Sequence, residues 1–210
     1  MIIKRTLWGI GTSRTIRAHW ALIELGLNYE TKTIRTRTPE METPEFLAVN
    51  PRRKVPVLVD GDLTITESPA IVTYLAERYS TESNQLIPEA VEARARYFEW
   101  MSFITMELDA TSLYVLRRHV DLPHIYGEAP AACETARAYF QRMMETTAPD
   151  VAAGGNFLLG DNFSGADIMM ASCLIFADLY DFQLPVEYTE YRERVMARPV
   201  YKKAIKANYP

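Results

Sequence analysis

Apolar residues follow two different spacings in the first part of the chain. Residues 2–8 form a short apolar run typical of a β-strand, and a glycine-containing turn follows at residues 9–13. Residues 28–34 alternate as a second strand, so the pattern predicts a strand–helix–strand crossover with parallel strands. Gly26 is expected to end the helix, with Leu27 packing back on Leu22. The helix between the strands is indicated by apolar residues spaced four, three and four apart: Ile16, Trp20, Ile23 and Leu27.

Residues 50–74 are expected to form a hairpin followed by a helix. Two short apolar runs flank the Asp60-Gly61 turn, and an Asp-Gly pair in this position favours a tight hairpin. Pro69 suits the first position of a helix, which predicts Ser68 as its N-cap. A helix N-terminus beside a free strand edge could hold a carboxylate-bearing, peptide-like ligand, because amides and dipole favour an anion there. The alternative is that the stretch is purely structural.

The second half of the chain lacks strand patterns. Turn formers occupy residues 80–89, and apolar positions then follow helical spacing through residues 90–120 and again through 131–147. Residues 168–180 are almost entirely apolar, which predicts a helix buried in a bundle, too short for a membrane span of roughly 20 residues. Ser164 and Asp167 are expected to cap this helix. Final helices are expected near residues 188–196 and 200–206.

Composition narrows the functional classes. The chain has 210 residues, of which 48% are hydrophobic and 24% charged, as in an ordinary globular protein. Its net charge of −4 argues against nucleic acid as the main partner. The separation of Cys133 and Cys173 makes a disulfide framework unlikely, and no histidine has metal-ligand spacing, so no metal site is expected. The first residues lack the apolar core of a secretory signal, which favours a cytoplasmic protein without membrane attachment.

Several motifs, in this order and spacing, resemble those of cytosolic glutathione transferases. They are SRTIRAHWALIELGLNYE, NPRRKVPVLVDG, ITESPAIVTYLAERY and FLLGDNFSGADI. The resemblance covers essentially the whole chain and implies an α/β plus all-α fold. A thioredoxin-like domain (βαβ–ββα) is expected over residues 1–80, a linker over 81–89, and an all-helical domain over 90–210. The family also implies a homodimer.

The resemblance implies a glutathione site on the first domain. Val55, before a cis Pro56, would offer its backbone to the cysteinyl part of glutathione as an added strand would. Ser68 and the helix amides would take the γ-glutamyl carboxylate, and Glu67 would help to hold the ammonium. Lys54, with Arg53, would meet the glycyl carboxylate, although a solvated basic loop is the competing interpretation.

The resemblance also implies that a group after the first strand stabilises the glutathione thiolate. A Ser-x-x-x-Arg pattern ending at Arg17 selects Ser13, whereas a plant-type pattern selects Thr12; Thr15 is a weaker candidate. The hydroxyl that is not used would serve only as a helix cap. Trp8-Gly9 stands where other classes have a tyrosine, and the first domain has no cysteine, so the chain resembles a serine/threonine-type, bacterial-like member.

The family fold implies that a small hydrophobic electrophile binds beside glutathione. Candidate pocket residues are Ile10, Phe103 and Tyr114, with Arg118 for an anionic group, although aromatic residues at helical spacing are more often core. The expected function is conjugation of glutathione to this electrophile. Glutathione-dependent reduction of peroxides or disulfides, and a non-catalytic binding role, remain as alternatives.

Overall fold

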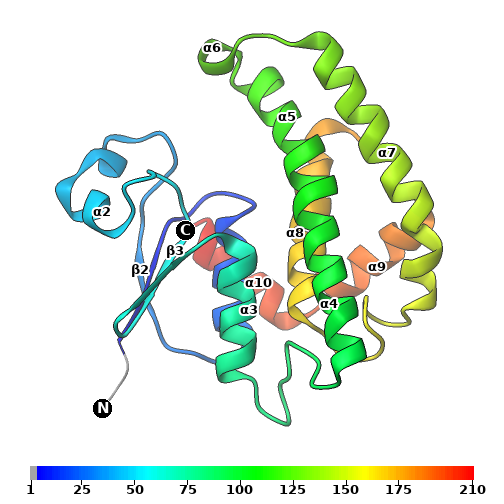
Figure 1. Cartoon of the computed structure of the whole chain (residues 1–210), viewed down its shortest axis with the longest axis horizontal. Helices are drawn as coiled ribbons and strands as arrows, with labels where there is room; N and C mark the ends of the chain where they lie inside the picture. The colour runs from blue at the N-terminus through cyan, green and yellow to red at the C-terminus, as the bar shows by residue number, and fades with distance from the viewer. Residues whose placement is uncertain (1–3) are drawn as a thin grey trace. The chain divides into compact units, whose positions relative to one another are not determined.

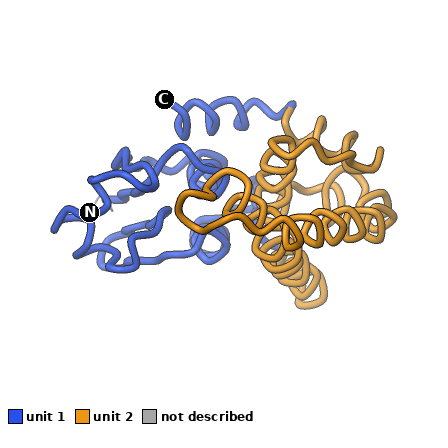
Figure 2. Tube along the Cα trace, turned by 90° about the horizontal axis from the view of Figure 1, so that it is seen from above, with its two compact units in different colours: residues 1–87, 197–210 blue, residues 88–196 orange. Residues whose placement is uncertain are grey.

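The chain forms two compact units in the computed structural model, which describes residues 4–210 (Figures 1 and 2). Residues 1–87 and 197–210 make up the first unit, and residues 88–196 make up the second. The last helix therefore belongs to the first unit, whereas the sequence suggested that it would join the other helices. The start of the first predicted strand, residues 2 and 3, lies outside the described residues.

The first unit is built around a four-stranded sheet with the order β2-β1-β3-β4. β1 and β2 are parallel, and β3 is antiparallel to both β1 and β4, which confirms the predicted crossover and hairpin. The turn places Asp60 opposite Leu63, with Gly61 at a φ of 61°. The elements are β1 (Arg5–Trp8), α1 (Thr15–Glu24), β2 (Glu30–Lys32), η1 (Pro39–Glu42), α2 (Pro44–Val49), β3 (Val57–Asp60), β4 (Leu63–Thr66), α3 (Ser68–Tyr79) and α10 (Pro199–Asn208).

Both faces of the sheet are covered (Figure 1). On the α2 side, Trp8 and Val57 pack in a core with Phe46 of α2, and the Trp8 and Phe46 ring centroids lie 5.8 Å apart. Leu7 and Leu58, the neighbouring residues of each strand, are fully buried and point to the opposite face. On that side α1 packs against both α3 and α10.

Local signals predicted the C-terminal end of α1 correctly but misplaced the start of α3 by one residue. The N–H of Leu27 donates to the carbonyl of Leu22 at 2.9 Å, and Gly26 has a φ of 65°, which confirms the predicted helix ending. The N-cap of α3 is Glu67, and Ser68 is already its first helical residue. The predicted N-cap was therefore wrong by one residue, because Glu67 itself takes a left-handed φ of 67° at the entrance to the helix.

The second unit is built from helices and contains no β-strand among its described residues. A continuous helical segment passes through π-helical turns, and α7 packs along it. α8 is buried along almost its whole length, as predicted. The elements are α4 (Val91–Phe103), η2 (Ile104–Leu113), α5 (Tyr114–Leu116), η3 (Arg117–Asp121), α6 (Pro123–Tyr126), α7 (Pro130–Ala153), α8 (Gly165–Ala177), η4 (Asp178–Tyr180) and α9 (Val186–Met196).

The predicted capping box at the start of α8 is present. The buried Asp167 carboxylate accepts hydrogen bonds from the Ser164 N–H and hydroxyl, both at 2.8 Å, and from the Leu158 N–H at 2.9 Å. The Tyr191 hydroxyl donates a further bond at 2.8 Å. Burial raises the pKa of Asp167, and these donors counteract that effect. The network ties α8 to α9 and to the preceding loop.

Candidate functional site

A hollow in the first unit collects most of the residues that the sequence motifs singled out. Lys54, Val55, Pro56, Glu67 and Ser68 all line it. The sequence analysis did not assign four further residues that line the same hollow: Arg14, Asn50, Arg52 and Thr66. The first turn of α1, the loop before β3 and the start of α3 therefore meet at one place.

The Val55-Pro56 peptide bond is cis, as the resemblance implied. Val55 precedes β3 and lies outside its ladder with β4. Gly9 permits the close approach of Val55 to the end of β1: it has a φ of 113°, and an added Cβ would lie 2.5 Å from the Val55 Cβ. This contact explains why residue 9 is a glycine.

Ser68 is positioned by a buried arginine. Arg17 of α1, only 1% exposed, donates from Nη1 to the Ser68 Oγ at 3.2 Å. Because the Ser68 oxygen accepts this bond, its own proton remains able to point at an acceptor in the hollow. The hydroxyl and the first amides of α3 thus form a site suited to a carboxylate.

The basic residues of the loop before β3 have different partners. Asn50 holds the loop by donating from Nδ2 to the Lys54 carbonyl at 2.8 Å and accepting the Arg52 N–H at 3.1 Å. Arg52 lines the hollow and lies 3.8 Å from the Glu67 carboxylate. Arg53 does not line it, and its Nε lies 3.1 Å from Glu42. Lys54 and Arg52, with Arg14, give the hollow an excess of positive charge.

The hydroxyls at the start of α1 are not equivalent. The Thr12 Oγ1 accepts the backbone N–H groups of Arg14 at 3.2 Å and Thr15 at 3.0 Å, so Thr12 caps the helix with its side chain. Its hydroxyl also lies 3.0 Å from that of Thr15. Ser13 is half-buried, and no partner for its hydroxyl is found within residues 4–210.

His19 has a structural role beside this loop. Its Nε2 lies 3.2 Å from the Gly9 carbonyl, so that nitrogen carries the proton, and Nδ1 accepts from the Tyr29 hydroxyl at 2.8 Å. Burial lowers the pKa of His19 to about 4. The imidazole is therefore neutral near neutral pH, and both nitrogens are occupied.

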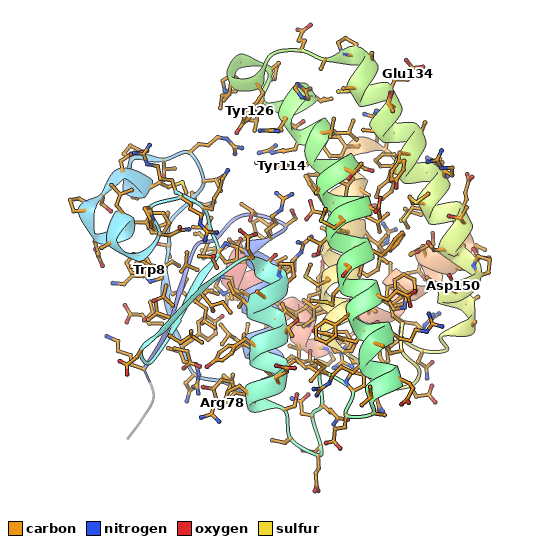
Figure 3. The ribbon with its side chains drawn as sticks, in the orientation of Figure 1. Trp8, Arg78, Tyr114, Tyr126, Glu134 and Asp150 are labelled. Carbon is orange, nitrogen blue, oxygen red and sulfur yellow. The ribbon has the colours of Figure 1, made fainter. Side chains whose placement is uncertain are left out.

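The residues predicted to bind an electrophile differ in burial and in the side chains that they contact. Ile10 is only 2% exposed in the core of the first unit. In the second unit, Phe103 is half-buried. The Arg118 guanidinium lies 4.7 Å from the centroid of the Tyr126 ring and 5.4 Å from that of Tyr114, and Figure 3 shows the two tyrosines close together. Tyr126, on the short helix α6, was not predicted, because nothing in its local pattern links it to Arg118.

Two further features bear on the chemistry of the chain. Within the described residues, no group of three or more His, Cys, Asp or Glu side chains could hold a metal ion. In the same part of the chain, every helix is too short or too polar to cross a membrane.

Comparisons with known proteins match both units. A family model of the glutathione S-transferase N-terminal domain matches residues 4–77, and one of the C-terminal domain matches residues 130–202. Glutathione S-transferase F10 of Arabidopsis thaliana is 38% identical over 47% of this chain and 43% of its own length. Glutathione S-transferase theta-1 of Bos taurus is 32% identical over 67% of this chain and 59% of its own. The chain thus spans about half the length of these relatives.

Solved structures of similar fold cover nearly the whole chain. The theta class glutathione S-transferase of Xanthomonas axonopodis pv. citri with glutathione bound has a TM-score of 0.80 and 27% identity, covering 96% of each chain. Ure2p in complex with glutathione has a TM-score of 0.86 over 99% of this chain and 95% of its own, and its 21% identity supports the fold alone. With both domain models matched in order, the chain belongs to the glutathione S-transferase family.

Proposed function

We propose that this chain is a glutathione transferase whose first unit binds glutathione in the hollow between α1, α3 and the loop before β3. The observation that carries the proposal is the pairing of Arg17 with Ser68, which leaves the Ser68 proton free at a helix N-terminus. Ser68 and the amides of α3 take the γ-glutamyl carboxylate, and Glu67 holds the ammonium. Val55 pairs with the peptide backbone, and Lys54 meets the glycyl carboxylate. The relative from Xanthomonas with glutathione bound supports this assignment.

Ser13 stabilises the reacting thiolate in this proposal. A free thiol has a pKa near 8.5, and each unit of depression corresponds to about 1.4 kcal/mol of preferential binding of the thiolate. A hydrogen bond from a hydroxyl to the sulfur, together with the positive end of α1, supplies that stabilisation. Thr12 already caps α1, which supports Ser13 as the donor.

The thiolate then attacks an electrophilic carbon of a small hydrophobic molecule. A carbon–sulfur bond forms, the leaving group departs with its electron pair, and the thiol proton has already passed to solvent. Phe103 and Tyr114 contribute the apolar surface for this molecule, and Arg118 takes an anionic substituent. Ile10 is left out of this proposal, because its side chain is buried and its N–H donates to the Ile34 carbonyl.

Binding of glutathione tests the first part of the proposal. Calorimetry should detect binding to the wild-type protein, and Lys54→Ala should weaken it about five- to tenfold through loss of one charge-assisted contact. Arg53→Ala is the matched control: it removes the adjacent positive charge, but Arg53 pairs with Glu42 and should leave the affinity nearly unchanged. Equal effects of the two substitutions would contradict the assignment, and absence of binding would contradict the proposed function.

Activity assays on the same purified protein distinguish two other functions, a non-catalytic binding role and glutathione-dependent reduction. A non-catalytic binding role is the second candidate, since the fold that the chain shares with Ure2p is not by itself evidence of catalysis. That role predicts glutathione binding without turnover of 1-chloro-2,4-dinitrobenzene. Faster turnover of a hydroperoxide or disulfide than of the aryl halide would indicate a reductase. Light scattering tests the homodimer that we expect from the family.

A further inference from the structure

The loop that carries Ser13 is held by a residue far away in the sequence. Asn208 is the last residue of α10, which packs against α1 within the first unit, and it is fully buried. Buried asparagines require hydrogen-bond partners, so the partners of this side chain indicate what it does.

Three contacts of the Asn208 side chain run to the loop or to the first residue of α1, and the neighbouring Tyr209 hydroxyl also interacts with this side chain. Its Oδ1 lies 2.6 Å from the Thr15 hydroxyl and 3.2 Å from the Gly11 N–H, and its Nδ2 donates to the Thr12 carbonyl at 3.0 Å. The Asn208 backbone carbonyl also accepts the Gly11 N–H, at 2.8 Å. The carboxamide thus connects residues on both sides of Ser13.

These bonds also determine which hydroxyl is available. The Thr15 hydroxyl has one proton, and its shortest contact is with Asn208, so it donates there and accepts from the Thr12 N–H at 2.9 Å. With that proton used, the Thr12 hydroxyl has the Thr15 oxygen as an acceptor at 3.0 Å, and its own oxygen accepts the Arg14 and Thr15 N–H groups. Both threonine protons are engaged, which leaves Ser13 with a free one.

We infer that Asn208 is a positioning residue for thiolate stabilisation: it fixes the loop from Gly11 to Thr15 so that the Ser13 hydroxyl faces the glutathione sulfur. The inference rests on the proposed function. Gly11, with a φ of 80°, gives the loop conformational freedom that the carboxamide removes. A packing role alone would not require bonds to both sides of Ser13.

The test compares asparagines at opposite ends of α1. Asn208→Ala removes the bonds to the loop, and Asn84→Ala removes a bond from the Asn84 side chain to the Glu24 carbonyl at the other end of the helix. The pKa of the bound thiol, measured from thiolate absorbance, should rise by about one unit in Asn208→Ala, lowering kcat/KM about tenfold below that pKa, with little change in KM for glutathione. Asn84→Ala should leave the thiol pKa unchanged.

Amide hydrogen exchange of residues 9–15 provides a readout independent of catalysis. Exchange there should accelerate in Asn208→Ala and not in Asn84→Ala, whether or not the proposed function is correct. If Asn208→Ala folds poorly, Asn208→Asp keeps the shape but replaces the N–H donated to Thr12 by an oxygen that repels the Thr12 carbonyl, and it should change both measurements in the same direction. Equal exchange and equal thiol pKa in both alanine variants would overturn the inference. Accelerated exchange with no thiolate detected in the wild type would instead refute the proposed function.

Discussion

Replacing Ser13 and Thr12 separately by alanine distinguishes thiolate stabilisation from helix capping. Ser13→Ala removes a hydroxyl that has no partner in the described structure, so the free energy of unfolding should change by less than about 0.5 kcal/mol. Thr12→Ala removes the side-chain cap on the Arg14 and Thr15 amides, which should cost about 1 kcal/mol. Thr12→Ala should therefore lower the free energy of unfolding more than Ser13→Ala does.

Ser13→Ala should lower kcat/KM more than Thr12→Ala does. A hydrogen bond to a charged group contributes about 1.5–3 kcal/mol, which corresponds to about one to two units of thiol pKa. Ser13→Ala should therefore lower kcat/KM about 10- to 100-fold at pH values below the thiol pKa, and the deficit should shrink as the pH rises. The profile of Thr12→Ala should keep the wild-type midpoint.

The assay is the pH dependence of kcat/KM for 1-chloro-2,4-dinitrobenzene, combined with urea denaturation of the same preparations. Ser13→Cys is not a suitable control, because it introduces a second thiol. If the midpoint shifts in Thr12→Ala and not in Ser13→Ala, the reasoning from free and occupied hydroxyls is refuted.

Three further predictions concern stability and binding. Burial lowers the pKa of His19 from 6.5 to about 4, so the unfolded chain binds a proton at a higher pH than the folded chain does. The free energy of unfolding of the wild type should therefore fall by about 3 kcal/mol between pH 6.5 and pH 4. Urea titrations at several pH values should show this loss in the wild type and not in His19→Gln. Asp167→Ala should cost about 3–5 kcal/mol by leaving buried donors such as the Tyr191 hydroxyl unpaired, and a thermal shift under a few degrees would contradict this. Gly9→Ala should displace Val55 and weaken glutathione binding at least tenfold. Gly26→Ala is the control, because an added Cβ there meets nothing within 4 Å. It should lower the free energy of unfolding by only about 1 kcal/mol and leave the affinity for glutathione unchanged.

Local patterns predicted most elements of the fold because their causes are local. The end of α1 at Gly26 and the cap of α8 at Ser164 each depend on a few neighbouring residues. The start of α3 was misplaced by one residue because Glu67, which is not a glycine, adopts a positive φ of 67°. Nothing in the sequence around Glu67 predicts that φ. Tertiary context overrode propensity at that position.

The sequence motifs predicted several of the residues that belong to the candidate site, but they did not predict the hydrogen bonds and ion pairs that those residues make. Sequence patterns left Ser13 and Thr12 as alternatives, and only the hydrogen bonds of the loop show that the Thr12 hydroxyl is engaged. Arg52 and Arg53 are adjacent and chemically identical, yet Arg52 pairs with Glu67 and Arg53 pairs with Glu42, a difference that no local pattern predicts. The contact of Asn208 with Thr12 spans 196 positions, beyond any local signal.

The division of the first unit into residues 1–87 and 197–210 has a consequence for synthesis. A ribosome makes the chain from its N-terminus, so the whole second unit must emerge before α10 can dock on α1. Until then, nascent chains carry the hollow without Asn208 to hold its loop, and translation that stops within the second unit yields a product in the same condition. The contacts of Asn208 with this loop therefore form only after the second unit has been synthesised.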